Sequence, residues 1–344
     1  MFIKERKLLN AQELKEKIIL TSQTQKIIEN NLNELKNIIS GKSDKFLIII
    51  GPCSVTDEKS ICNYAQKLLK IYDAMRQKIF IVLRVFTVKS RTNLNSYKGL
   101  VHQPNLFETE NLYNGIIMHR KIILKIIELT GFAIANEFVY PQIFNYADDL
   151  ISYYTLGART CDSQMHKLFL SGTDVPVGVK NSQAGNLFEN ISSIQNSHKL
   201  FLDGYETKTT GNIFAHAILR GTNFNLNNAA LSEITNLNTN YHYENLIETI
   251  KKYPPLENKF IIVDTNHSNS NKNSFEQPRI AKEILFNRKQ NDLIKKYVRG
   301  LMIESFLESG RQNENGMVFG KSITDPCLGI YETEKLLNYI AQHL

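Results

Sequence analysis

The chain has 344 residues, 42% of them hydrophobic and 22% charged, so it can bury a large core and is neither disordered nor fibrous. Its net charge of +7 is a weak sign of nucleic-acid partners, because Lys, Asn and Ile are abundant throughout. No apolar run approaches the roughly 20 residues of a membrane span, and no signal-type segment follows the first residues. The four cysteines lack CxxC spacing, which favours reduced thiols. We expect a cytoplasmic protein that binds neither membrane nor nucleic acid.

The first 45 residues are rich in Lys, Glu and Gln, and apolar side chains recur at helical spacing between Ile27 and Ile39. This predicts an N-terminal arm with one helix packed outside the core, over residues 1–45. The catalytic domain is predicted over residues 46–344. It opens with an apolar, β-branched run at 46–50 that ends at a rigid Gly-Pro-Cys turn, as expected of a strand buried on both faces.

Strands and helices then alternate to the end of the chain. Further strands are predicted at 79–86, 132–139, 155–160, 175–180, 213–220, 260–264 and 300–304. Helices are predicted at 60–75, 112–129, 141–153, 163–171, 187–194, 243–252, 278–287 and 333–343. A turn-rich stretch at 199–212 breaks this rhythm and predicts a β-hairpin insertion before strand six.

Strand-helix alternation implies a parallel sheet, and eight such units indicate an α/β fold of the closed (β/α)8 TIM-barrel type. The N-terminal helix is then an extension of this barrel. The alternative is an open doubly wound sheet, which usually carries a Gly-rich phosphate loop after its first strand. No such loop is present here.

Several residue types that bind metals follow the predicted strands. Cys53 follows strand one, Asp264 and His267 stand at the end of strand seven, Glu304 ends strand eight, and Asp325 lies in the loop after it. A thiol, an imidazole and carboxylates together suit a divalent transition metal better than magnesium. Each residue alone could instead be a helix cap, an ion-pair partner or a structural histidine. Only their convergence on one barrel mouth favours a metal site.

A second set of strand-end residues is basic. It comprises Arg84, Lys89, Arg91, Arg159, Lys180 and Arg220. A lone basic residue is usually a solvated surface charge, but a cation in or just after a buried strand needs an anionic partner. Six such cations at one barrel end predict ligands with several negative charges, such as phosphates and carboxylates.

Nine motifs occur in the same order as in the class I (microbial) DAHP synthases, the 3-deoxy-D-arabino-heptulosonate 7-phosphate synthases. They are GPCSVTD, LRVFTVKSRT, YKGLVHQP, GART with DSQMH, PVGVKN, AILRG, VDTNHSNS, LMIESFLESGRQ and GKSITDPCLG. The sequence therefore resembles this family over about residues 10–344. The resemblance implies condensation of phosphoenolpyruvate with erythrose 4-phosphate, the first step of the shikimate pathway to chorismate and the aromatic amino acids, by a homodimer or homotetramer.

The resemblance also implies roles for particular residues. The metal ligands would be Cys53, His267, Glu304 and Asp325, holding Mn, Co, Fe or Zn. Lys89 would act with the ligands Cys53 and His267 in catalysis, as the proton donor. The phosphoenolpyruvate site would comprise Arg84, Lys89, Glu137, Arg159, Lys180 and Arg220. Lys89, Arg91 and Thr92 match a KPRT motif that also serves erythrose 4-phosphate.

Departures from the family pattern lie beside these residues. Ser90 replaces the motif's proline, Tyr97 a tryptophan, Gln103 an acidic residue and Asn266 a serine. They bear on loop rigidity and affinity more than on the chemistry. Two more departures bear on regulation: Asp174 and Asp203 stand where small serines commonly line the cavity for phenylalanine or tyrosine, which predicts weak or absent inhibition by either. Alternatively, both aspartates cap surface turns.

Two other functions remain open. One is the related synthase that joins phosphoenolpyruvate to a different aldose, arabinose 5-phosphate, against which the KSRT sequence and the N-terminal arm argue. The other is a non-catalytic regulatory paralogue, against which the intact ligand set argues. A nucleic-acid-binding role is less supported, because no basic stretch is interleaved with aromatic residues.

Overall fold

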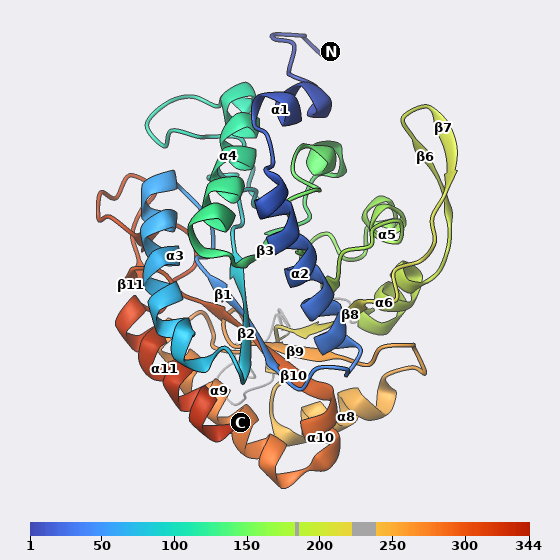
Figure 1. The fold of residues 1–344 in the computed structure, drawn as a ribbon, viewed down its shortest axis with the longest axis vertical. Helices are drawn as coiled ribbons and strands as arrows, with labels where there is room; N and C mark the ends of the chain where they lie inside the picture. Colours follow the sequence, from blue (N-terminus) through green and yellow to red (C-terminus); the bar gives the residue numbers. More distant parts are fainter. Residues whose placement is uncertain (183–185, 222–238) are drawn as a thin grey trace, which may run out of the picture.

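The computed structural model describes residues 1–182, 186–221 and 239–344 (Figure 1). Eight parallel strands close into a barrel in the order β1-β10-β9-β8-β5-β4-β3-β2. Their bounds are β1 Phe46–Gly51, β2 Ile79–Arg84, β3 Ala133–Glu137, β4 Tyr153–Leu156, β5 Val177–Lys180, β8 Ala215–Leu219, β9 Ile261–Asp264 and β10 Val298–Glu304. The predicted (β/α)8 barrel is confirmed.

Helices surround the barrel and extend it at the N-terminus (Figure 1). The α-helices are α1 Ala11–Lys17, α2 Ser22–Ile39, α3 Glu58–Tyr72, α4 Leu112–Thr130, α5 Gln164–Leu170, α6 Leu187–Gln195, α8 Tyr243–Lys252, α9 Gln277–Gln290, α10 Asp292–Tyr297 and α11 Ile330–His343. Short 3-10 helices are η1 Asp73–Met75, η2 Pro141–Tyr146 and η3 Ser274–Glu276. Among the residues described, no helix has the length and hydropathy of a membrane span.

In the described parts of the chain, two small sheets lie outside the barrel. The antiparallel pair β6 Lys199–Leu202 and β7 Tyr205–Lys208 forms a hairpin, which confirms the insertion predicted before the sixth barrel strand. The second pair, β11 Glu308–Arg311 and β12 Lys321–Ser322, follows the last barrel strand and was not predicted. Its sequence is polar and short, so it carries no strand signal.

The barrel strands are apolar on both faces because each face packs against other residues. In β1, Leu47 and Ile49 belong to a cluster of buried residues contributed mainly by the strands, whereas Ile48 and Ile50 pack in the larger cluster shared with the outer helices. The alternation of side chains along a strand therefore divides the core into a barrel interior and a barrel-helix layer.

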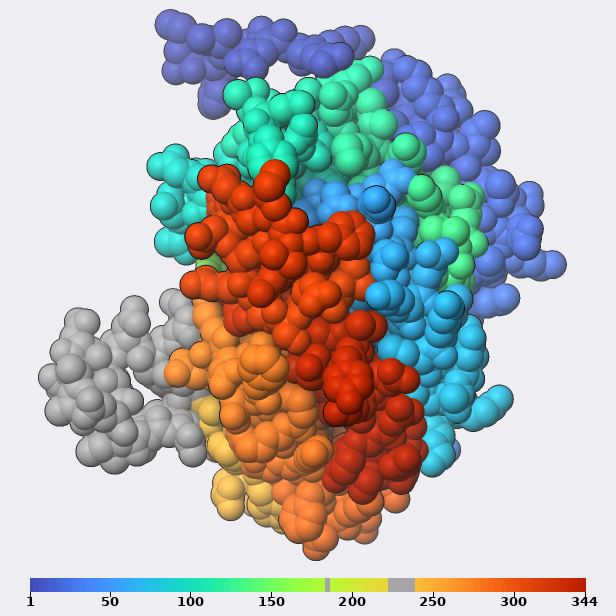
Figure 2. Space-filling view, turned by 90° about the vertical axis from the view of Figure 1, so that its left-hand side faces the viewer, coloured from blue at the N-terminus to red at the C-terminus, as the bar shows by residue number. Residues whose placement is uncertain are grey.

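The N-terminal extension closes one end of the barrel. Leu35, Ile38 and Ile39 of α2 are buried in the same cluster as the interior strand residues, so the last turns of this helix cover the end where the strands begin. A capping box at Asn10 starts α1, and the side chain of Thr21 accepts a hydrogen bond from the backbone of Thr24 at the start of α2. The first residues of the chain stand off from the body of the molecule (Figure 2).

One predicted helix was largely wrong. The segment 141–153 forms the 3-10 helix η2 only as far as Tyr146, and Tyr153 already begins β4. Tyr153 is fully buried in the barrel interior, and this tertiary burial outweighs the local helical pattern. The strand predicted at 155–160 correspondingly ends at Leu156, because Gly157 starts a turn that is closed by backbone hydrogen bonds from Thr160 and Cys161.

Candidate active site

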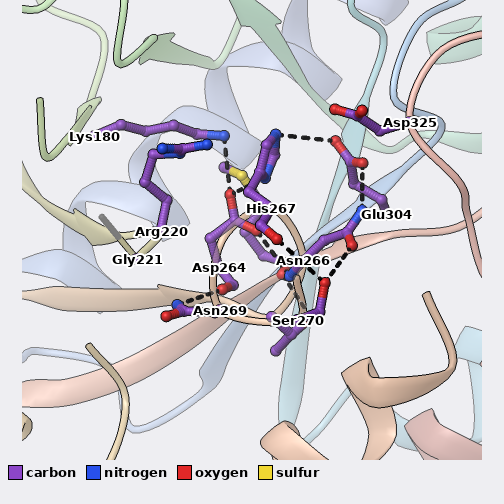
Figure 3. Close-up of polar contacts among 12 residues, drawn as sticks. Lys180, Arg220, Gly221, Asp264, Asn266, His267, Asn269, Ser270, Glu304 and Asp325 are labelled. Carbon is purple, nitrogen blue, oxygen red and sulfur yellow. Dashed lines mark hydrogen bonds and ion pairs between the residues drawn. The ribbon is translucent and has the colours of Figure 1, made fainter. Parts of the chain in front are cut away.

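The predicted site residues gather at the carboxyl ends of the barrel strands (Figure 3). Five charged residues are the last residues of their strands: Arg84 in β2, Glu137 in β3, Lys180 in β5, Asp264 in β9 and Glu304 in β10. Cys53 and Arg220 follow the ends of β1 and β8. Parallel strands bring all these positions to one mouth of the barrel, which is where enzymes of this architecture place their chemistry.

Three of the four predicted metal ligands form a compact cluster. Ligand atoms of Cys53, Glu304 and Asp325 lie within 4.8 Å of one another. The Sγ atom of Cys53 is 3.9 Å from Oδ2 of Asp325. Cys53 and Glu304 are buried, and Asp325 is partly exposed. One sulfur and two carboxylate oxygens so close together fit a divalent transition metal.

His267 lies beside this cluster, with its ring between two carboxylates (Figure 3). Its Nδ1 is 2.8 Å from Oδ2 of Asp264, and its Nε2 is 3.7 Å from Oε1 of Glu304. Its backbone takes a left-handed conformation, with a φ of 52°. A carboxylate against one ring nitrogen while the other faces the ligand cluster is the arrangement that usually orients a metal-binding histidine. His267 therefore fits as the fourth ligand.

Without a metal ion, burial and the charges around the cluster shift the pKa values of two of its proposed ligands, Cys53 and Asp325. Burial and the charge of Glu304 raise the pKa of the Cys53 thiol to about 11. The pKa of Asp325 is lowered to about 2, because the charges of His267 and Lys272 outweigh the opposing effect of burial. A bound divalent cation would offset both carboxylates and favour the thiolate.

Arg84 and Lys180 are buried cations that pair with strand-end carboxylates. Nη2 of Arg84 donates a 2.8 Å hydrogen bond to Oε1 of Glu304, and Nζ of Lys180 donates a 2.9 Å hydrogen bond to Oδ2 of Asp264. Nε and Nη1 of Arg84 are buried without a hydrogen-bond partner in the described parts of the chain. Unused donors on a buried cation are costly unless a ligand accepts from them, so this guanidinium fits an anionic substrate.

Arg220 lies alongside Lys180, with both charged ends on the same side as His267 (Figure 3). Arg220 is 8% exposed, and among the described residues no carboxylate lies within ion-pair distance of it. Burial lowers the pKa of its guanidinium, against the raising effect of Asp264. A buried cation that lacks a direct partner is suited to bind an incoming anion.

Lys89 reaches the cluster from the loop after β2. Its Nζ is 3.0 Å from the carbonyl oxygen of Cys53, 3.5 Å from the sulfur of the same residue and 3.8 Å from Oε2 of Glu137. Burial disfavours the charged form, but Cys53 and Glu137 together raise the pKa of Lys89. Its side chain is therefore held as an ammonium group beside the candidate metal site.

The other predicted substrate residues form an outer rim. Arg91 donates from Nε to the carbonyl of Tyr97 at 2.7 Å, and Arg159 donates from Nε to Oγ1 of Thr92 at 3.2 Å. Arg159 and Thr92 are exposed. The structure thus joins Arg159 to the KSRT loop but does not place it in contact with the buried cluster.

Three residues near the cluster had no assigned role in the sequence analysis. Asn266, noted there only as a departure, donates a 2.6 Å hydrogen bond to Oε2 of Glu304. Gln277 exchanges hydrogen bonds with the backbone of Glu304, and Nζ of Lys272 lies 3.2 Å from Oδ1 of Asp325. No local motif marks Gln277 or Lys272, because their partners are 27 and 53 positions away in the sequence.

The sequence is similar to that of known proteins over nearly its whole length. The family model described as the DAHP synthetase I family matches residues 17–338. A phospho-2-dehydro-3-deoxyheptonate aldolase of Corynebacterium glutamicum is 31% identical over 340 residues, covering 94% of this chain and 87% of the relative. A Trp-sensitive phospho-2-dehydro-3-deoxyheptonate aldolase of Buchnera aphidicola subsp. Schizaphis graminum is 32% identical over 348 residues, covering 97% and 94%.

The fold gives the same result. The solved structure of a phospho-2-dehydro-3-deoxyheptonate aldolase from Francisella tularensis SCHU S4 superposes with a TM-score of 0.87 and 27% identity, covering 100% of this chain and 98% of that one. Family match, relatives and structural neighbour all extend over nearly the whole chain. The chain belongs to the DAHP synthetase I family.

Proposed function

We propose that the protein is a DAHP synthase, which condenses phosphoenolpyruvate with erythrose 4-phosphate and releases inorganic phosphate. The observation that carries this proposal is the barrel mouth itself. There, three cations, Arg84, Lys180 and Arg220, lie around a thiol-carboxylate cluster. Among the described residues, two nitrogens of Arg84 have no hydrogen-bond partner and Arg220 has no carboxylate within ion-pair distance. A site that combines excess cations with transition-metal ligands suits two phosphorylated substrates, one of which is an aldehyde.

Cys53, His267, Glu304 and Asp325 would hold the divalent metal, whether Mn, Co, Fe or Zn. When bound, such an ion supplies Lewis-acid polarisation of the aldehyde oxygen of erythrose 4-phosphate. The donor set supports this proposal because it combines sulfur, nitrogen and oxygen ligands, a mixture that favours transition metals over magnesium.

The buried cations would bind phosphoenolpyruvate. Arg84 offers two free guanidinium nitrogens, and Arg220 with Lys180 offers a pair of adjacent positive charges for the phosphate and carboxylate groups. Fixing both substrates within reach of each other is an orientation effect worth several kcal/mol, to order of magnitude. Arg159 would add to the phosphoenolpyruvate site from the rim, and Arg91 and Thr92, with Lys89, would hold the phosphate of erythrose 4-phosphate.

Lys89 would donate a proton to the oxygen that becomes an alkoxide as the new carbon–carbon bond forms. Its ammonium group lies next to the candidate metal site, and the carboxylate of Glu137 at 3.8 Å favours its charged form. The enol carbon of phosphoenolpyruvate attacks the aldehyde carbon, water adds to the resulting cationic carbon, and phosphate departs. Neither carboxylate ligand needs to act as a nucleophile.

This reaction is the first step of the shikimate pathway, which leads through chorismate to the aromatic amino acids. A cytoplasmic location and assembly into a homodimer or homotetramer remain predictions of the family resemblance. The regulatory paralogue remains an alternative, although the retained ligands and cations argue for catalysis.

The proposal is tested by comparing two aldoses in one assay. Loss of phosphoenolpyruvate is followed with erythrose 4-phosphate and, separately, with arabinose 5-phosphate. We expect rapid consumption with the first sugar, a heptulosonate product by mass spectrometry and little reaction with the second. Lys89→Gln should remove the activity, whereas Lys121→Gln on the exposed face of α4 should leave it unchanged. A preference for arabinose 5-phosphate, or no reaction with either sugar in metal-replete protein, would overturn the assignment.

A further inference from the structure

A cavity of about 1240 Å³ lies at the end of the barrel opposite the candidate active site. It is lined by the segment that links α2 to β1, by residues just before β2 and β9, and by α10 with the start of β10. These are the amino ends of the strands, whereas the residues of the candidate active site lie at the carboxyl ends. The cavity is therefore a separate feature of the fold.

The cavity is strongly basic. Basic side chains in its lining outnumber acidic ones by seven to three. The acidic residues Asp44, Glu257 and Asp292 are all exposed. Among the described residues, none of them forms an ion pair with a basic residue of the lining. Lys45 of the lining pairs with Glu34 at 3.4 Å, so the positive charge of the cavity is only partly neutralised by the described residues.

Two arginines of the lining are half-buried close to each other. Nη1 of Arg288 donates to the carbonyls of Lys295, at 2.9 Å, and Val298, while Arg299 donates to the carbonyls of Ile38, at 3.1 Å, and Ser43. Within the described residues, Nε and Nη2 of Arg288 have no hydrogen-bond partner and neither arginine has a carboxylate partner. Burial and the charge of Arg299 lower the pKa of Arg288 to about 10. The two guanidinium groups therefore disfavour each other unless an anion lies between or beside them.

Two lysines add to this charge in the same manner. Nζ of Lys78 donates to the carbonyl of Ala341 at 2.8 Å, and Nζ of Lys259 donates to the carbonyl of Tyr253 at 3.0 Å. Each ammonium group thus lacks a carboxylate partner in the described parts of the chain, as the two arginines do. The buried cations at the opposite mouth differ, because Arg84 and Lys180 both pair with carboxylates there.

We propose that this cavity binds a small phosphorylated metabolite. Four unpaired cations match a group that carries two or more negative charges, which a phosphate ester does and a single carboxylate does not. The volume exceeds that of inorganic phosphate, and the lining includes Tyr297 and Leu256, against which the organic part of such a ligand can pack.

The site is positioned to influence the catalytic end of the barrel. The strands that begin beside the cavity are β1, β2, β9 and β10, and they run to Cys53, Arg84, Asp264 and Glu304. Arg299, for example, lies in the same strand as Glu304. The binding proposal itself rests only on the cavity and stands apart from the proposed reaction.

The experiment measures binding of inorganic pyrophosphate to chelator-treated protein by isothermal titration calorimetry. Pyrophosphate can also occupy the candidate active site, so Arg220→Gln protein serves as the background in which that site is weakened. The cavity is altered by the double substitution Lys78→Gln and Lys259→Gln, which removes two charges but keeps a donor at each position. The matched control, Lys67→Gln with Lys70→Gln, removes two charges from exposed positions of α3.

We expect the cavity variant to raise the dissociation constant for pyrophosphate at least tenfold in the Arg220→Gln background, and the control to change it less than twofold. Equal affinities in the cavity variant and the control would overturn the proposal. Unaltered protein provides a second measurement that does not depend on the folding of variants. Pyrophosphate should protect Lys78 and Lys259, but not Lys67 and Lys70, from acylation read out by peptide mass spectrometry, and equal labelling of all four lysines would also contradict the site.

Discussion

Asn266 holds one oxygen of the Glu304 carboxylate through a 2.6 Å hydrogen bond from its side-chain amide. The other oxygen accepts from Arg84 at 2.8 Å. The hydroxyl of Ser270 donates to Oδ1 of Asn266 at 2.8 Å and so fixes the orientation of the amide (Figure 3). A proposed metal ligand is thus oriented by a residue at which the sequence departs from the serine of the family that it resembles.

Replacing Asn266 by serine, the residue of the family pattern, should weaken metal binding in this chain. The shorter side chain cannot reach Oε2 of Glu304 from the same backbone position, so the carboxylate loses one of its two anchors. We expect the metal dissociation constant to rise roughly 10-fold to 100-fold, the usual cost of losing such a partner. Competition with a chromophoric chelator measures this directly. Asn114→Ser, at an exposed position of α4, is the control, and equal metal affinity in the two variants would refute the positioning role.

Arg159→Ala should raise the Michaelis constant for phosphoenolpyruvate and leave metal affinity unchanged. Arg159 is exposed at the rim and contacts Thr92 rather than the ligand cluster, so its loss should affect the proposed substrate contact and leave the metal ligands in place. We expect an effect of tenfold or more, about 1.4 kcal/mol, because the substrate would cover the guanidinium on binding. Steady-state kinetics with metal analysis check this. Unaltered kinetic constants would show that Arg159 does not bind substrate.

Buried histidines should make the fold sensitive to acid. His216 is fully buried in the barrel interior, where its ring nitrogens contact Tyr153 and the carbonyl of Phe214, and burial lowers its pKa to about 4. The unfolded chain takes up a proton near pH 6.5, before the folded protein does, so stability is complete above that pH and falls as the pH drops toward 4. The loss for this group is about 3 kcal/mol, to order of magnitude.

Chemical denaturation between neutral pH and pH 4.5 tests this relation. The free energy of unfolding of His216→Gln should fall less steeply with decreasing pH than that of the unaltered protein, whatever its stability at neutral pH. His343→Gln, near the C-terminal end of α11, provides the comparison. Identical slopes for His216→Gln and the unaltered protein would contradict the assignment.

Sequence pattern located most of the barrel because apolar, β-branched runs are buried on both faces of a parallel strand. The run Phe46–Gly51 and the helix Tyr243–Lys252 appear where local pattern predicts them. The pattern failed at Tyr153, where burial inside the barrel decides the structure, and in β11 and β12, whose residues carry no apolar alternation. Local periodicity cannot report a contact that only the closed barrel creates.

The candidate site was predictable in its residue types but not in its pairings. An arginine inside an apolar strand is conspicuous, so Arg84 could be picked out from sequence, but its partner Glu304 is 220 positions away. Lys180 and Asp264 are likewise paired across 84 positions. Asn266 carried a signal only as a departure from a family pattern. Its hydrogen bond to Glu304 appears once β9 and β10 lie side by side.

Phenylalanine and tyrosine should inhibit this protein weakly or not at all. The side chain of Asp174 is 83% exposed and lies 2.5 Å from Nζ of Lys36, and Asp203 occupies the turn between β6 and β7 with a φ of 50°. Both residues therefore lie at the surface, and the hydrogen-bond partner of the Asp174 carboxylate is Lys36 of α2 and not the backbone of a turn. Steady-state assays with millimolar amounts of each amino acid check this, and strong inhibition by either would contradict the expectation.

The proposed metal-dependent condensation is tested by measuring phosphate release from phosphoenolpyruvate before and after chelation. We predict that release requires erythrose 4-phosphate, disappears in excess EDTA once metal analysis shows the protein to be metal-free, and returns with Mn(II), Co(II) or Zn(II). The reason is that Cys53, Glu304 and Asp325, with His267 beside them, form a cluster suited to such an ion. Full phosphate release by verified metal-free protein would contradict this mechanism.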